Sequence, residues 1–188
     1  MKRRELLSLT GLSLLPVLQV SSALAQVAPQ VPTEVQKYLG AEARLRGLAR
    51  LRWLGLSIYE ARLWVGDGFE PEQFERRQLA LELVYARALK GPLIAERSLD
   101  EMRRGPPIAQ EQAHRWLEFM KQAFPDVREG DRLTGVWLPG DQHSRFYFNG
   151  NASQALRDAG FGPRFFGIWL APHTSQPALR QQLLGQAS

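Results

Sequence analysis

The chain has 188 residues, of which 44% are hydrophobic and 23% are charged, a composition typical of a globular protein with one domain. It contains no cysteine, which excludes a disulfide framework and a thiolate metal site. The formal net charge of +5 is spread along the chain and not gathered in one patch, so we expect no nucleic-acid partner.

The first 25 residues have the pattern of a signal peptide. A basic segment, Lys2 to Arg4, precedes a mostly apolar stretch from Leu6 to Val20, and Ala23 to Ala25 forms a small-residue cleavage site. The apolar stretch is too short to span a bilayer stably. We therefore expect a periplasmic or secreted protein without a stable membrane span after cleavage; a retained N-terminal anchor is the alternative. Arg3 to Leu7 also resembles a twin-arginine signal, so both the Sec and the twin-arginine routes stay open.

Residues 26–40 carry two prolines and are interpreted as a linker or N-terminal segment that ends in a helical turn from Thr33. Residues 41–188 are expected to form the folded domain. The leader holds three of the 24 basic residues and one of the 19 acidic residues, so 21 basic and 18 acidic residues remain. This mild excess says little about partners.

An alternating pattern runs through residues 43–65. Leucines and Trp53 alternate with arginines up to Gly55, which indicates a strand with one wet face. A second alternation follows to Val65, so the segment is either two consecutive strands or one long bent strand. The simplest interpretation of the arginines is that they form a solvated face of the sheet and bind no ligand.

The rest of the chain alternates between strand and helix patterns. Strands are predicted over 79–87, 131–138 and 143–148, and helices over 71–77, 93–103, 108–124 and around 161–170, while 151–160 stays ambiguous. A last amphipathic helix begins near Pro177, with Ser175 as its expected cap. The five tryptophans are expected in the core. These elements predict an α+β fold: an antiparallel sheet of six or seven strands with helices on one face.

Several motifs resemble the chalcone isomerase family, and most closely its bacterial exported chalcone isomerase-like members. They are RWLGLSIYEARLWV at 52–65, FNG at 148–150, FFGIWL at 165–170 and S-x-P-x-L-R-x-x-L-L at 175–184. Together with the segments between them, the resemblance covers roughly residues 40–185 and implies an open-faced β-sandwich.

The catalytic set implied by the resemblance is largely missing. The family enzyme closes a chalcone to a flavanone with an arginine and a threonine from the first strands and a tyrosine after the central strand. The threonine position falls here on Leu54 and the tyrosine position on Ile94, while the arginine position falls near Glu42, with Arg44 or Arg46 possible. Leucine and isoleucine cannot donate to an oxyanion, so we expect no catalytic residues of this kind.

Family members without the catalytic set include fatty-acid binders. We therefore expect an exported, non-catalytic protein that binds a small apolar acid such as a fatty acid in the cleft between sheet and helices. Arg50, Arg52 or Arg87 would pair with the carboxylate, and Tyr59 or Tyr85 would assist. The alternatives are a periplasmic isomerase or lyase with a rearranged active site, and an envelope interaction protein.

No cofactor and no metal are predicted. Glu111, His114 and Glu118 share one helix face and are the best candidate metal ligands, but a polar surface helix explains them equally well. The histidines are otherwise far apart in the sequence, and neither a nucleophile elbow nor a phosphate-binding glycine-rich loop is present.

Overall fold

The computed structural model describes residues 29–186, so the expected signal peptide and the first residues of the expected linker lie outside it. These residues build one antiparallel sheet whose six strands neighbour one another in chain order. The predicted α+β fold with six or seven strands is confirmed. The strands are β1 (Arg44–Trp53), β2 (Leu56–Val65), β3 (Leu79–Tyr85), β4 (Arg132–Leu138), β5 (His143–Phe148) and β6 (Asn151–Arg157).

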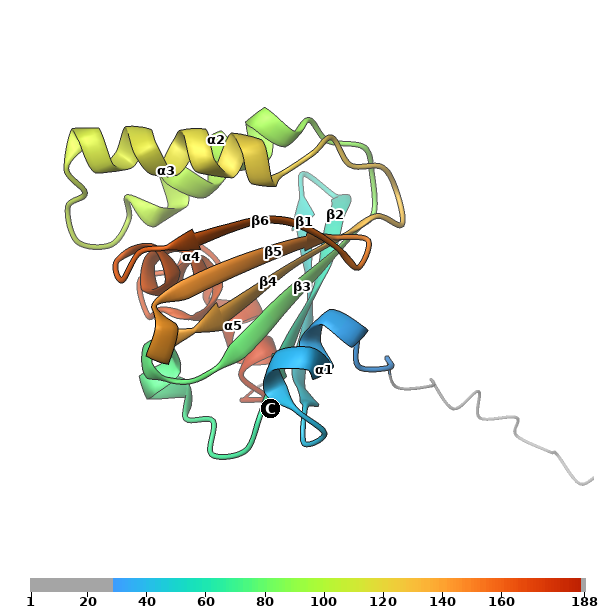
Figure 1. The fold of residues 1–188 in the computed structure, drawn as a ribbon. Coiled ribbons are helices and arrows are strands. Elements are labelled where there is room, and N and C mark those ends of the chain that lie inside the picture. The colour runs from blue at the N-terminus through green and yellow to red at the C-terminus, as the bar shows by residue number, and fades with distance from the viewer. Residues whose placement is uncertain (1–28, 187–188) are drawn as a thin grey trace, which may run out of the picture.

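Four helices pack on one face of the sheet and a short helix rests on the other (Figure 1). The first group is α2 (Gly91–Met102), α3 (Gln110–Ala123), α4 (Phe161–Leu170) and α5 (Pro177–Leu183). The other face carries α1 (Thr33–Leu39), which falls within the expected linker. Two 3-10 turns complete the elements: η1 (Pro71–Arg76) and η2 (Pro139–Asp141).

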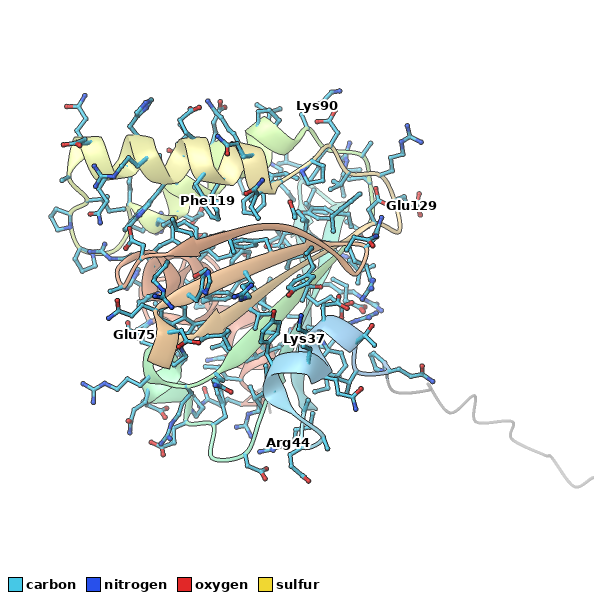
Figure 2. The ribbon with its side chains drawn as sticks, in the orientation of Figure 1. Lys37, Arg44, Glu75, Lys90, Phe119 and Glu129 are labelled. Atoms are coloured by element: carbon cyan, nitrogen blue, oxygen red, sulfur yellow. The ribbon has the colours of Figure 1, made fainter. Side chains whose placement is uncertain are left out.

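The alternation of β3 divides its side chains between the two faces. Leu81 and Leu83 belong to the main core under the four helices, and Ala80 belongs to the smaller core under α1. Aromatic rings dominate the main core between the sheet and α4: Phe146 on β5 meets Phe165 at 5.0 Å between centroids. Phe119 of α3 points toward the sheet (Figure 2) and also packs on Phe146. The helices are thus fixed to the sheet by aromatic edges and faces.

The face under α1 is closed by charged side chains. Glu82 on β3 is buried and accepts hydrogen bonds from Trp64 Nε1 at 3.1 Å and from Arg132 Nη1 at 2.6 Å. Glu34 of α1 is also buried; it accepts from Thr134 Oγ1 at 3.1 Å and lies 3.6 Å from Arg132. Because buried carboxylates require such partners, this network attaches α1 to the sheet.

Two local predictions differ from the structure, and one segment left open is now assigned. The third strand ends at Tyr85 and not at Arg87, because residues 86 and 87 form a bend after the pairing with β2 stops. The ambiguous segment after residue 150 is the edge strand β6. Ser175 is not the cap of α5, which begins after Gln176 without a side-chain cap. No helix within residues 29–186 is long and apolar enough to cross a membrane.

Candidate functional site

A cavity of about 410 Å³ lies between the sheet and the helices. This volume falls within the range of small-molecule sites. Its walls come from the β1–β2 hairpin, the end of β3, α2, and the segment from α4 to the start of α5. The lining residues are mostly apolar: Leu51, Trp53, Ile58, Tyr59, Tyr85, Leu89, Leu93, Ile94, Arg97, Ser98, Glu101, Ile168, Trp169, Ser175 and Gln176.

The position of each wall follows from local sequence. Pro92 in the first turn of α2 suits a helix start, and the Gly91 amide donates to Asp126 at 3.0 Å. The Lys90 ammonium and this amide hold the pKa of the Asp126 carboxyl below its usual range. On the far side, Gly47 of β1 has no side chain, and the backbone of Leu183 occupies the space that a Cβ would need. The β1–β2 hairpin therefore packs closely on α5.

Two tyrosines face each other in the cavity. The rings of Tyr59 and Tyr85 lie 6.1 Å apart in an edge-to-face arrangement. Burial raises the pKa of Tyr59 to about 12, and the Glu101 carboxylate contributes to this increase. Burial also raises the pKa of Tyr85 well above its ordinary value, with the neighbouring Tyr59 adding to it. Both phenols are therefore neutral at physiological pH and can donate hydrogen bonds.

The hydrogen bond of Trp169 fixes the role of Tyr59. Trp169 Nε1 lies 2.9 Å from the Tyr59 hydroxyl, and an indole nitrogen can only donate. The Tyr59 oxygen is therefore the acceptor, and its own proton remains available. Within residues 29–186 neither phenol has a hydrogen-bond acceptor among the protein's own groups. The cavity thus presents two O–H donors that a bound molecule can satisfy.

A charged pair on α2 forms the polar end of the cavity. Arg97 and Glu101 lie one helical turn apart and are ion-paired. Their exposures differ: the Arg97 side chain is 66% exposed and that of Glu101 is 10% exposed. Oε2 of Glu101 is buried, has no hydrogen-bond partner among the described residues, and lies 3.7 Å from Arg104 Nε. Arg97 thus reaches toward solvent, while Glu101 stays inside.

The structure brings two of the five predicted binding residues to the cavity. Tyr59 and Tyr85 line it, whereas Arg50, Arg52 and Arg87 are exposed and lie outside its lining. Arg50 is opposite Glu60 in the β1–β2 pairing and donates to it at 3.0 Å. These arginines thus fit a solvated surface of the sheet better than a role in binding a carboxylate inside the cavity.

Sequence reasoning did not select the two charged residues of α2 that line the cavity, Arg97 and Glu101. They lie in the helix predicted over 93–103, and neither is among the candidate ligand contacts that the sequence suggests. The available signal was helical spacing: Arg97 follows Leu93 by four residues, and Glu101 follows Arg97 by four. Such a pair on a helix usually indicates a solvated face, so the pattern alone does not select the cavity.

The positions that the resemblance assigns to the catalytic threonine and tyrosine lie in different places. Ile94 lines the cavity, while Leu54 is in the β1–β2 turn, 87% exposed and outside the lining. Neither side chain has a proton to transfer. Within residues 29–186 no three histidine, aspartate or glutamate side chains gather closely enough to hold a metal ion.

Comparison with known proteins gives a consistent picture of the fold. The chain is 29% identical to an uncharacterized protein of Haemophilus influenzae over 140 residues, which covers 74% of this chain and 67% of that protein. Its structure is similar to that of a fatty-acid binding protein of Arabidopsis thaliana, with a TM-score of 0.57 and 10% identity over 77% of this chain and 88% of that one. At this identity the likeness shows the fold alone. A family model described as chalcone isomerase-like matches residues 36–185, and the chain therefore belongs to the chalcone isomerase-like family.

Proposed function

We propose that this protein is a non-catalytic binder of a small apolar acid, such as a fatty acid, and that the cavity between β1–β3 and α2 is its site. The observation that carries the proposal is an apolar cavity of about 410 Å³ with two neutral phenol donors and an arginine at its edge. Apolar walls hold a hydrocarbon chain through burial, while a few converging polar groups orient it. The fatty-acid binding protein of Arabidopsis with the same fold makes this ligand class a reasonable first choice.

Arg97 replaces the strand arginines as the carboxylate partner in this proposal. It lines the cavity, and one of its terminal nitrogens is used by Glu101. A guanidinium carries five N–H donors in a planar fork, so its remaining donors are free for a second carboxylate. The Tyr59 and Tyr85 hydroxyls then donate to the same head group, and the chain of the ligand lies along Leu51, Ile58 and Ile168.

Glu101 makes the site selective. An acid in the cavity shares the space with a second carboxylate, one of whose oxygens lacks a hydrogen-bond partner among the described residues. Arg97 can bridge the two carboxylates, but repulsion between them weakens binding of any anion. We therefore expect modest affinity for acids, and a gain for ligands that carry a hydroxyl donor near the carboxylate.

The lack of catalysis in this proposal is supported by side-chain chemistry. The positions implied for the threonine and the tyrosine of the enzyme are Leu54 and Ile94, and neither can donate to a developing charge. The phenols that line the cavity stay protonated at neutral pH because burial raises the pKa of both. They are thus poor general bases, since such a base works best with a pKa near the working pH.

The proposal is tested by native mass spectrometry of the protein purified without detergent, followed by solvent extraction. The expected result is an adduct with the mass of a fatty acid, which extraction removes and added fatty acid restores. Arg97→Met should weaken rebinding, and Arg52→Met, on the outer surface, serves as the matched control. Turnover of a hydroxylated chalcone without any adduct would instead support the isomerase alternative and contradict the binding role.

We further propose that the protein is exported to the periplasm or secreted. The support is the basic start, apolar stretch and Ala-Leu-Ala site within residues 1–25, which lie outside the described residues. Intact mass of the protein from a periplasmic extract should correspond to a chain that begins at Gln26. A full-length chain found only with the cytoplasm would contradict export.

A further inference from the structure

The tip of the β1–β2 hairpin exposes large apolar side chains at the edge of the cavity. Trp53 is 59% exposed, Leu54 87% and Leu56 54%, and Leu93 at the start of α2 is 61% exposed. We call these four residues the apolar tip. Trp53 and Leu93 also line the cavity, and the hairpin turn lies at the end of the sheet nearest the start of α2 (Figure 1). A soluble protein rarely gathers such residues on its surface without a binding role, and the expected core position of Trp53 is wrong.

The turn itself indicates that the leucine is retained against its conformational preference. Leu54 and Gly55 join β1 to β2 with φ of 49° and 78°. Asn149 and Gly150 join β5 to β6 with nearly the same φ, 49° and 82°. Asparagine and glycine are the residues that such a two-residue turn favours, whereas a leucine with positive φ is strained. The chain thus uses the favourable residue in one hairpin and an exposed leucine in the other.

Among the described residues, two arginines without an ion pair lie beside the apolar tip. Residues 50–58 and 85–97 contain five basic residues and a single acidic one, Glu96. Three of the five are paired with carboxylates that lie outside these two ranges: Arg50 with Glu60, Lys90 with Asp126, and Arg97 with Glu101. Within residues 29–186, Arg52 and Arg87 make no ion pair. The Ala86 amide donates to the carbonyl of Ile58 at 3.0 Å, which places Arg87 beside the same hairpin as Arg52.

We propose that the apolar tip docks on the surface of an anionic lipid bilayer. Tryptophan and leucine enter the headgroup region of a membrane readily, and each arginine near an anionic surface adds to the attraction. Pairing of two copies through this surface is less favourable, because a two-fold contact would bring the unpaired arginines of both copies together. The phosphate groups of a lipid surface would attract these arginines, whereas the arginines of a second copy would repel them.

Docking in this orientation would place the cavity mouth against the membrane. Because Trp53 and Leu93 belong both to the apolar tip and to the lining, a ligand could pass between the bilayer and the cavity without crossing water. This consequence depends on the proposed binding function. The docking surface itself does not depend on that function, because it rests on the exposure of the apolar tip, the geometry of its turn and the neighbouring arginines.

Trp53 provides a direct measurement on the full-length chain. The other four tryptophans are buried, so brominated acyl chains in a vesicle should quench Trp53 selectively. We expect quenching with vesicles of phosphatidylcholine and phosphatidylglycerol and little with phosphatidylcholine alone. Trp53→Phe should still sediment with the anionic vesicles but lose the quenching. The N-terminal residues are the same in all variants, so differences between variants arise at the tip.

Substitutions separate the apolar and the electrostatic parts. Leu54→Asn, which suits the turn, should bind anionic vesicles about tenfold more weakly, because a leucine no longer leaves water. Arg52→Gln and Arg87→Gln should each lose roughly fivefold, and only on anionic vesicles. Arg44→Gln, exposed at the opposite end of the molecule from Lys90 (Figure 2), is the matched control and should change nothing.

Two results would overturn the proposal. One is unchanged fluorescence of the wild-type chain with brominated anionic vesicles. The other is a dimer in sedimentation that Leu54→Asn converts to a monomer, which would assign the apolar tip to a second copy. If instead docking is observed and no fatty acid binds, the proposed binding function fails and the docking surface stands.

Discussion

The charge pair in the cavity predicts opposite effects for its two members on acid binding. If the cavity binds a carboxylate, Glu101→Gln should strengthen the binding of dodecanoic acid and Arg97→Met should weaken it. A sphere of 410 Å³ is about 9 Å across, and we use this length as the separation between the ligand carboxylate and Glu101. At an effective dielectric constant of about 20, two like charges at that distance repel by about 2 kcal/mol. Arg97 offsets part of this repulsion, and we expect a gain of about 1 kcal/mol, or roughly fivefold in affinity.

The effect of Arg97→Met follows from the same geometry. A hydrogen bond to a charged group contributes about 1.5–3 kcal/mol when protected from water. The Arg97 side chain is 66% exposed, so solvent screening reduces the expected loss to about 1 kcal/mol. The substitution also leaves Glu101 with only the more distant Arg104, 3.7 Å away, as its cation, which lowers stability. The double variant with Glu101→Gln removes that second effect and serves as the structural control.

Titration calorimetry with dodecanoic acid and with dodecanol measures both effects. The two ligands share a hydrocarbon chain and differ in charge, so neither substitution should change the affinity for dodecanol by much. Equal shifts for acid and alcohol, or shifts of the same sign for both substitutions, would refute the role assigned to the pair. Unfolding midpoints of each variant show whether a loss of binding comes from a loss of structure.

Three further predictions concern the tyrosines, the turn and the cavity volume. The pKa of Tyr59 is raised from its ordinary value of 10 to about 12, so the folded state holds a proton that the unfolded state releases between these values. The stability that this contributes is complete below pH 10 and is lost as the pH rises toward 12. Tyr59→Phe should therefore reduce the fall in the free energy of unfolding, measured with urea, between pH 10 and pH 12. An unchanged fall would contradict the burial of Tyr59. Leu54→Asn should stabilise the fold by about 1 kcal/mol, because asparagine adopts a positive φ more readily than leucine, and should raise the Tm by about 2–4 °C. Leu56→Asn, in the adjacent strand, should not raise the Tm. A lower Tm for Leu54→Asn would contradict backbone strain at Leu54. Ile168→Trp should fill the cavity and reduce binding of acid and alcohol alike, and unaltered calorimetric affinity for both would place the ligand elsewhere.

Helices and strands with a regular spacing of apolar residues were predictable from the sequence, whereas an edge strand without such a spacing was not. Two successive alternations predicted β1 and β2, as two strands or one long bent strand, because in each alternation one face is exposed to water and the other contacts the core. β6 escaped prediction since it is an edge strand with mostly exposed residues and no apolar alternation. Its pairing with β5, and not its own composition, makes it a strand. The helical turn predicted from Thr33 is the start of α1 (Thr33–Leu39); its full length could not be predicted, because its few apolar residues are buried by a second core on the other face of the sheet.

The charged part of the site was harder to predict than its aromatic part. Tyr59 and Tyr85 pair across β2 and β3, and their position in strands with one apolar face already directs them inward. An arginine in a strand gives no such direction, since a carboxylate on the next strand decides whether it faces water, as Glu60 does for Arg50. Arg97 lines the cavity because α2 forms one of its walls, next to the β1–β2 hairpin. This tertiary arrangement cannot be derived from helical spacing alone.

Trp169 explains how a packed core and a cavity of this size coexist on one face of the sheet. Protein interiors are normally close-packed, and the aromatic cluster of α4 meets that rule, with Phe165 and Trp169 rings 5.5 Å apart. On its other side Trp169 faces the cavity and donates to Tyr59. A smaller ring there would lose the donor and open the cavity toward the core, where a second void of about 40 Å³ already borders Trp169. The indole therefore serves as the wall that separates the cavity from the core, and it makes the Tyr59 oxygen an acceptor so that the Tyr59 proton is left for another partner.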